Sequence, residues 1–114
     1  MKTPSIYLQL IHECLVKIQS YTQDMNEQAF LENQLVQDAV IRNFEIIGEA
    51  TKKLNSDFRA KYPEIEWKKI AGMRDKLIHD YIGVDLWAVW GVVEEILPVL
   101  VFQIAIILEK ERNC

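Results

Sequence analysis

Apolar residues recur every three or four positions along most of this 114-residue chain, and this spacing limits what it can fold into. Such spacing puts side chains on one face of an α-helix, whereas a half-buried strand alternates at every second position. In the first segment, expected to be helical from Pro4 to about Thr22, these residues are Leu8, Ile11, Leu15 and Ile18. The sequence shows no strand alternation, internal repeat or low-complexity stretch. It therefore predicts an all-α fold.

Three further main helices are expected. They cover about residues 33–54, residues 63–81 with Gly83 after their end, and Leu86–Arg112 with Asp85 as N-cap and a kink at Pro98. Short helical turns are expected within residues 24–33 and after Asn55. The prediction is an up-down bundle of four main helices plus short helices, forming one domain over residues 1–114.

The second main helix is apolar on two sides. One side is formed by Ala39, Val40, Ile47, Ala50 and Leu54, and a flank away from it by Ile41, Phe44 and Gly48. Glycine costs helix stability, so Gly48 indicates close approach of another helix. We expect one side to face the chain's own core and the flank to face a second protomer.

A charged stripe runs along the same helix. Its members are Asp38, Arg42, Glu45, Glu49 and Lys52, which share one face at ~100° per residue. They are explained either by pairs four residues apart, such as Asp38 with Arg42 and Glu49 with Lys53, or by a cleft that they line.

The last helix is the most apolar segment. We expect a mostly core role for Trp87, Trp90, Val93, Ile96, Leu97, Leu100, Val101, Ile104 and Leu108. The run from Ile96 to Leu108 is shorter than the ~20 residues of a membrane span, and Pro98 and Gln103 interrupt it. We interpret it as a buried helix and expect no membrane association.

Charge and cysteine content narrow the classes of function. The formal net charge of −4 argues against a broad nucleic-acid coat, so any such site must be local. The best local basic cluster consists of Lys68, Lys69, Arg74 and Lys76. Cys14 and Cys114 lie too far apart for a zinc pair and do not indicate a disulfide framework, which favours a reduced, cytoplasmic setting. The N-terminal residues do not form a signal-peptide core.

Residues 72–81 contain the closest grouping of side chains that could take part in a reaction. They are Arg74, His79 and Tyr81, in the pattern R-x4-H-x-Y. Histidine exchanges protons near neutral pH, and arginine donates paired hydrogen bonds to phosphate oxygens. Together the two residue types can cut a phosphodiester without a metal. The plain alternative is a solvated polar helix face. Five helical positions turn ~140°, so Arg74 and His79 do not share a face, and a two-fold dimer with a shared cleft would use them better. The sequence contains no Gly-rich phosphate loop and no metal-ligand spacing.

Several stretches resemble the HepT-like family, also called DUF86, of the HEPN superfamily. They are Asp38–Ala50, Trp67–Asp75 followed by His79, Tyr81 and Val84-Asp85, and Leu86–Pro98. The resemblance covers nearly the whole chain. It implies an all-α HEPN bundle that dimerises, with two R-x4-H-x-Y motifs at the interface. Members are toxins of toxin–antitoxin pairs that act as metal-independent ribonucleases. Their antitoxins are minimal nucleotidyltransferases that can transfer AMP to the motif tyrosine.

Carried over residue by residue, the resemblance makes Arg74 and His79 catalytic and Tyr81 the modification or RNA-positioning residue. Asp75 departs from the small polar residue usual after the arginine. With Lys76 it is an accessory candidate, as are two residues at family positions, Arg42 and Glu49. No metal or other cofactor is expected. The alternative function is a non-catalytic HEPN module that binds a nucleotidyltransferase or nucleotides. The sequence does not indicate which RNA is cut.

Overall fold

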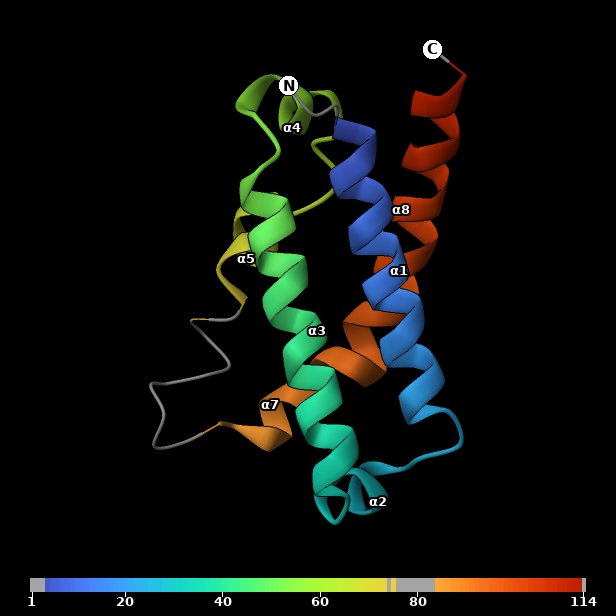
Figure 1. Ribbon diagram of the computed structural model, residues 1–114, viewed down its shortest axis with the longest axis vertical. Coiled ribbons are helices and arrows are strands. Elements are labelled where there is room, and N and C mark those ends of the chain that lie inside the picture. Colours follow the sequence, from blue (N-terminus) through green and yellow to red (C-terminus); the bar gives the residue numbers. More distant parts are fainter. Residues whose placement is uncertain (1–3, 74, 76–83, 114) are drawn as a thin grey trace.

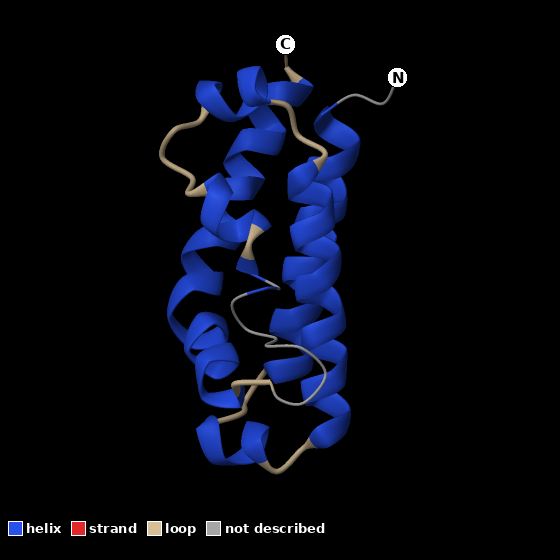
Figure 2. Ribbon diagram, turned by 90° about the vertical axis from the view of Figure 1, so that its left-hand side faces the viewer, coloured by secondary structure: helices blue, strands red, loops and turns tan. Residues whose placement is uncertain are grey.

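The computed structural model describes residues 4–73, 75 and 84–113. In that part, helices α1 (Pro4–Thr22), α3 (Gln34–Lys52) and α8 (Leu97–Arg112) run along the long axis, and the two chain ends lie at the same end of the bundle (Figure 1). The short helices α2 (Glu27–Leu31), α4 (Ser56–Lys61), α5 (Trp67–Ala71) and α7 (Leu86–Gly91) fill the two ends and one side. Figure 2 shows the same bundle from the side, with helices throughout its length. The predicted all-α bundle is confirmed.

The core forms where α1 packs between α3 and α8. The α1 residues Leu8, Leu15 and Ile18 have no exposed surface, as predicted from their spacing. Val40 and Ile47 of α3 and Ile104 of α8 are equally buried. Each such side chain stabilises the fold by about 1.5–3 kcal/mol relative to leaving it in water. The predicted bounds of α1 and α3 are confirmed to within one or two residues.

Side-chain caps start four of the helices. Asn26, Asn33, Asn55 and Asp85 accept hydrogen bonds at 2.8, 3.1, 2.8 and 3.0 Å from backbone N–H groups three residues later. Each satisfies a donor that the first turn of a helix leaves unpaired. The predicted cap at Asp85 is therefore confirmed.

The predicted helix over residues 63–81 is wrong at its start. Pro63 lies in a turn, in which the N–H of Ile65 bonds the Tyr62 carbonyl at 3.2 Å, and α5 begins only at Trp67. The indole N–H of Trp67 donates to the carbonyls of Arg59 and Tyr62, at 3.1 and 3.0 Å, and so ties the new helix back to the turn. α5 ends at Ala71 with Gly72 as C-cap, and Met73 and Asp75 are helical again.

The last helix is continuous from Leu86 to Arg112 but contains a π-helical segment, η1 (Val92–Ile96), between α7 and α8. A π turn holds an extra residue, and Pro98, two residues after the π segment, has no N–H to bond back, so both features disturb the helix where a kink was predicted. The extra residue also shifts the phase of the helix. Trp87 and Ile96, both expected in the core, are 65% and 49% exposed.

The prediction that the run from Ile96 to Leu108 is a buried helix is only partly right. Leu97, Leu100 and Ile104 are buried, but the opposite face is open to solvent. By length and composition alone, the helix Leu86–Arg112 could cross a membrane: its most apolar window has a mean hydropathy of 2.1, and 33% of that window is buried. Core helices of soluble proteins also meet this criterion.

Gly48 does mark a close helix approach, but the neighbour belongs to the same chain. A Cβ at Gly48 would lie 3.4 Å from the Ala71 carbonyl oxygen and 3.8 Å from that of Ile70, both in α5. Phe44 on the same flank is 1% exposed. At Gly48 the flank expected to face a second protomer is thus covered by α5, so the close approach that Gly48 indicates is not a dimer contact. The dimer itself stays a prediction.

Candidate functional site

Most of the predicted site residues lie outside the described residues. These are Arg74, Lys76, His79 and Tyr81. Asp75 is described and exposed. The structure therefore locates the site by the described residues on either side of residues 74–83, which are Met73 after α5 and Asp85 before α7.

The residues directly before the motif segment, up to Met73, are firmly packed. α5 lies against α3 at Gly48, Trp67 and Ile70 are 5% and 6% exposed, and Met73, directly before Arg74, is 8% exposed. The Trp67 ring also packs edge-on against Phe58, with 6.1 Å between ring centroids. These contacts hold the chain in one place up to the residue before the motif.

The segment returns at an equally fixed point. Asp85 caps α7, and its carboxylate accepts the N–H of Ala88 at 3.0 Å. Val89 is fully buried, and Trp90 packs against Phe30 of α2 with 5.3 Å between ring centroids. Both ends of the motif segment are therefore anchored in the core, on α5 and on α7.

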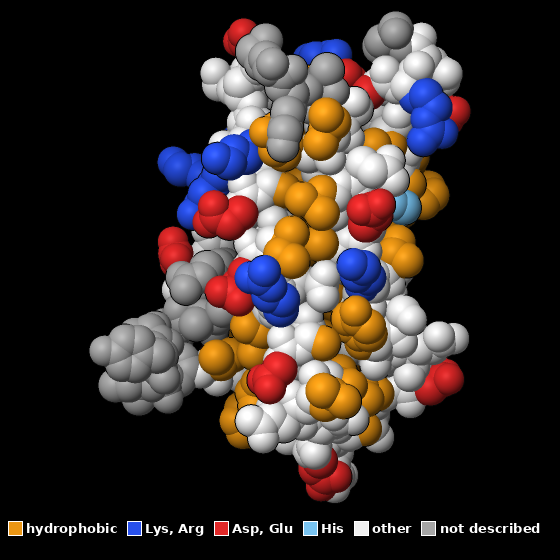
Figure 3. All heavy atoms as spheres, in the orientation of Figure 1, with side chains coloured by type: hydrophobic (Ala, Val, Ile, Leu, Met, Phe, Trp, Pro, Cys, Tyr) orange, Lys and Arg blue, Asp and Glu red, His pale blue; other side chains and the backbone are white. Residues whose placement is uncertain are grey.

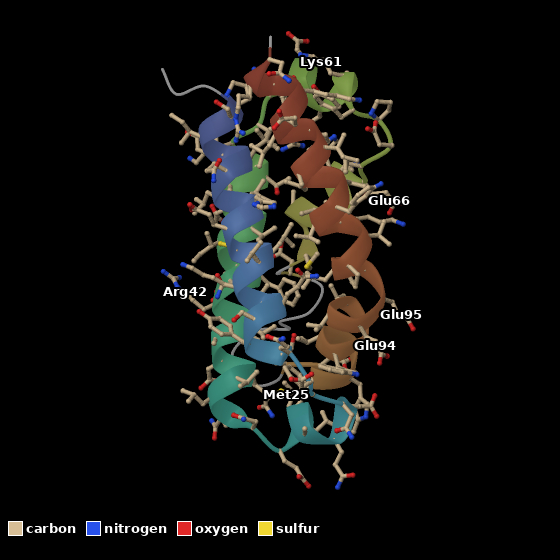
Figure 4. The ribbon with its side chains drawn as sticks, turned by 90° about the vertical axis from the view of Figure 1, so that its right-hand side faces the viewer. Met25, Arg42, Lys61, Glu66, Glu94 and Glu95 are labelled. Carbon is tan, nitrogen blue, oxygen red and sulfur yellow. The ribbon has the colours of Figure 1, made fainter. Side chains whose placement is uncertain are left out.

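A groove of about 560 Å³ opens between these two anchor points. Ile70 and Met73 form one wall, and Val92, Val99 and Leu100 of η1 and α8 form the other. The groove is also lined by three glutamates, Glu64, Glu66 and Glu95, and by Lys69. The Lys69 ammonium lies 2.9 Å from the Glu66 carboxylate. Figure 4 shows Glu66, Glu94 and Glu95 projecting outward along the same edge. An apolar groove with an acidic rim suits a protein partner better than a phosphate backbone.

The charged stripe of α3 lines a different groove. Arg42, Glu45 and Glu49 face Tyr7 and Leu10 of α1 around about 420 Å³. Figure 3 shows apolar side chains gathered along this seam between α1 and α3, with charged ones on both sides. Glu49 pairs with Lys52 at 3.6 Å, one position before the expected Lys53. The cleft explanation of the stripe is therefore supported, but Arg42 and Glu49 do not share the groove that contains Met73.

Exposed lysines lie on the two helices that form the first anchor point. Lys52 and Lys53 end α3, and Lys68 and Lys69 lie on α5, which packs against α3. Carboxylates hold two of them, Lys52 through Glu49 and Lys69 through Glu66. Lys53 and Lys68 are the best candidates for contacts with a polyanion.

The described residues contain no group of three or more His, Cys, Asp or Glu side chains arranged to hold a metal ion. Cys14 is a free, buried thiol, and burial raises its pKa, which makes it unreactive. His12 on α1 is half-buried. Sequence reasoning had not identified the groove between α5 and α8, because its walls come from segments distant in sequence.

The comparisons with known proteins agree on one family. The model of the family described as "Ribonuclease HepT-like" matches residues 11–107. A Methanocaldococcus jannaschii protein named "Gamma-glutamylcyclotransferase and putative RNase" is 48% identical over 109 residues, 96% of this chain, and this chain spans about half (49%) of that relative. A "Putative RNase" of Caldanaerobacter subterraneus is 41% identical over 98% of this chain and 100% of its own.

A third relative, the "Probable ribonuclease HepT" of Thermococcus cleftensis, is 46% identical over 82% of this chain and 86% of its own length. No solved structure matches significantly. The matched family segment includes residues 74–81, and thus the whole R-x4-H-x-Y motif.

Proposed function

Because this chain belongs to the HepT-like ribonuclease family, we propose that it is a metal-independent endoribonuclease and the toxin of a type II toxin–antitoxin pair. The observation that carries the proposal is the family match over residues 11–107 together with an intact R-x4-H-x-Y set. The fold supports it by anchoring both ends of the motif segment in the core.

The proposed reaction is attack of the RNA 2′-hydroxyl on the adjacent phosphorus. One His79 imidazole takes the hydroxyl proton as general base while the new O–P bond forms, and a protonated imidazole, from the second protomer, returns a proton to the departing 5′-oxygen. Arg74 holds the phosphate and offsets the charge that develops in the transition state. The products are a 2′,3′-cyclic phosphate and a 5′-hydroxyl.

A dimer completes this site in the proposal. On a continuous helix Arg74 and His79 would point ~140° apart, so a cleft shared by two protomers brings arginine and histidine side chains to one phosphate. Lys53 and Lys68, both exposed, are proposed to guide the RNA backbone. Arg42, Glu49, Asp75 and Lys76 stay accessory candidates, and Arg42 and Glu49 belong to the groove against α1.

Inhibition is proposed to act through Tyr81. A nucleotidyltransferase antitoxin transfers AMP to its hydroxyl, with pyrophosphate leaving ATP. The added phosphate competes for Arg74 and repels the RNA backbone, as charge-adding modifications do beside an arginine site. We propose that both partners act in the cytoplasm.

The second candidate function is a non-catalytic module that binds a nucleotidyltransferase or nucleotides. The net charge of −4 and the acidic rim of the groove at Met73 favour it, because both oppose tight RNA binding. The two functions differ in one direct observation, the cleavage of RNA by the purified protein.

The first prediction concerns metals. The purified protein is incubated with RNA in excess EDTA and, in parallel, in magnesium. We expect the cleavage rate to be the same within about twofold, since proton transfer by histidine and charge compensation by arginine need no metal. Cleavage that stops in EDTA and returns with added magnesium would contradict the mechanism. RNA that stays intact under both conditions would favour the binding module.

A further inference from the structure

Trp87 on α7 exposes its indole ring, although tryptophan has the largest side chain and this residue was expected in the core. It is 65% exposed, whereas the other two tryptophans, Trp67 and Trp90, are 5% and 6% exposed. Its neighbours Leu86 and Ala88 pack against the core, but Trp87 does not. Within the described part of the chain, its ring contacts no other ring and no cation. The ring is therefore available to a ligand.

The helix that carries this ring is fixed in place. Asp85 caps α7 two residues before Trp87, and Val89, two residues after it, is fully buried. Trp90 packs against Phe30 with 5.3 Å between the ring centroids. A tryptophan ring on a fixed backbone has only two side-chain torsions left to order, so a ligand that packs on it costs little conformational entropy.

The ring is close in the sequence to the R-x4-H-x-Y motif. Trp87 follows Tyr81 by six residues and His79 by eight. A fully extended chain spans at most about 3.6 Å per residue, so the Cα atoms of Trp87 and Tyr81 are no more than about 22 Å apart. An RNA strand bound at the motif is thus near enough to place one of its bases on the ring.

The surroundings of Trp87 favour a nucleobase over a phosphate or a protein partner. In the described sequence around it, the nearest charged residues are carboxylates, Asp85 before it and Glu94 and Glu95 after it, which disfavour phosphate. Trp87 is also the single exposed residue of α7, whereas a protein interface is marked by a contiguous apolar patch. Nucleobases are neutral and stack on aromatic rings. Because bases in a duplex already stack on each other, the ring suits an unpaired base.

We propose that the indole of Trp87 stacks on an unpaired nucleobase of the RNA and so makes single-stranded RNA the class of substrate. The proposal rests on the RNA substrate of the proposed function. Stacking gives an acidic chain affinity for RNA without further positive charge. It releases no counterions, unlike contacts of Lys53 and Lys68 with the RNA backbone, and it therefore depends little on salt.

The first test measures the binding of a fluorescein-labelled 2′-O-methyl RNA oligonucleotide by anisotropy, because this strand lacks the hydroxyl that the proposed reaction uses as nucleophile. Trp87→Ala should weaken binding of the single strand about 5- to 150-fold, as expected for the loss of one base–aromatic stack. Trp87→Phe keeps a ring and should retain most of the affinity. A duplex of the same sequence should bind equally to the wild type and to Trp87→Ala.

Phe102→Ala is the matched control. Phe102 is an aromatic residue, 66% exposed, on the same continuous helix, and it lies fifteen positions, or about 22 Å, from Trp87. This variant should bind the single strand as the wild type does. Circular dichroism checks that all variants are folded.

The salt dependence of binding separates stacking from an effect on charge. Trp87→Ala should leave the slope of log affinity against log salt concentration unchanged. Lys68→Ala is the reference for a lost cation and should reduce that slope by about 0.7. A smaller slope for Trp87→Ala would contradict stacking as the cause of the lost affinity.

Tryptophan fluorescence reports on the contact directly, because Trp87 is the one exposed tryptophan of three. The single strand should quench the emission of the wild type. Trp87→Phe, which keeps the two buried tryptophans, should show no quenching. AMP is the second arm, since a free nucleotide also carries an unpaired base. Quenching by AMP at the same concentrations as by the strand would assign the ring to free nucleotides and overturn its role in RNA binding.

Other results would also overturn the proposal. They are wild-type affinity of Trp87→Ala for the single strand, an equal loss of affinity in Phe102→Ala, and wild-type emission that the strand does not quench, as expected if a protein partner contacts the ring instead. None of these experiments measures cleavage. RNA that is still cut when stacking fails would leave the ribonuclease proposal standing, and stacking without cleavage would favour the binding module.

Discussion

At the scale of single residues, the proposed proton transfers depend on one histidine position, His79, in each of two protomers. The chain has two histidines, and His12 lies half-buried on α1, in an element separate from both anchor points of the motif. Only His79 has an arginine and a tyrosine within five positions. The types of residue needed for the chemistry could be read from the sequence, because they are local in it. Their arrangement around a phosphate could not, because in the proposed dimer it depends on how two copies meet.

Tyr81 carries the prediction on inhibition. After co-expression with the cognate nucleotidyltransferase, peptide mass spectrometry should find AMP on the Tyr81 peptide and the protein should no longer cut RNA. Tyr62 is the internal control, since its ring is 6% exposed and its hydroxyl donates to Glu111. Loss of toxicity with an unmodified Tyr81 peptide would show that complex formation alone inhibits.

At the scale of elements, the helices were predicted correctly where their sequence signals lie close together in the chain. α1 and α3 were predicted well, because caps such as Asn33 and the 3.6-residue period lie within a few positions of each other. The exposure of Trp87 and Ile96 was missed, because the π turn at Val92–Ile96 leaves no clear sequence signal and rotates what precedes it. Gly48 correctly indicated a close neighbour, but the identity of α5 as that neighbour is a long-range property.

The cap of α7 should matter for activity beyond its effect on stability. Asp85→Ala removes the acceptor for the Ala88 N–H and should lower the free energy of unfolding by about 1 kcal/mol. Because Asp85 also fixes the point to which the motif segment returns, RNA cleavage should fall more than the loss of folded protein explains. Denaturant unfolding and cleavage rates are measured on the same samples.

Asn33→Ala is the matched control for this prediction. Asn33 caps α3 through an equivalent bond of 3.1 Å to the Val36 N–H, at the end of α3 away from its contact with α5 at Gly48. It should lose similar stability and keep the wild-type cleavage rate. Equal activity losses in the two variants would mean that Asp85 acts only through global stability.

Glu111 links the end of α8 to the end of α4 and gives the fold a pH dependence. Its carboxylate accepts hydrogen bonds from the Tyr62 hydroxyl and from the Lys61 ammonium, the latter at 2.9 Å, and these bonds lower the pKa of Glu111. The stabilisation is fully present above the unfolded pKa, about 4.3 for glutamate, and is lost as pH falls through the lower folded pKa. Glu111→Gln should therefore lower Tm at pH 7 and have a smaller effect at pH 3.

Glu109→Gln serves as the control for Glu111, because its partner Arg112 is exposed and 3.3 Å away. Exposed pairs contribute little, so its Tm should follow the wild type at both pH values. The same Tm difference for Glu111→Gln at pH 7 and pH 3 would show that the carboxylate's charge does not stabilise the link.

At the scale of the whole molecule, the proposed function requires a small acidic bundle to act on a polyanion. With a net charge of −4, the chain offers RNA only local positive charge, near Lys53 and Lys68 and in the motif itself. A dimer would double the number of these local positive charges, but it would double the net negative charge as well. The fold was thus largely predictable from one sequence, whereas the assembly depends on surfaces that form only after folding.

Cleavage of RNA by this chain through His79 is best tested by comparing wild type with His79→Ala on one RNA in EDTA. Both proteins are purified identically, checked for helical content and mass, and assayed for rate and for the ends of the products. We expect 2′,3′-cyclic phosphate ends for the wild type and a cleavage rate on the order of 10²- to 10⁴-fold lower for His79→Ala. Equal cleavage rates in a folded His79→Ala preparation would contradict it.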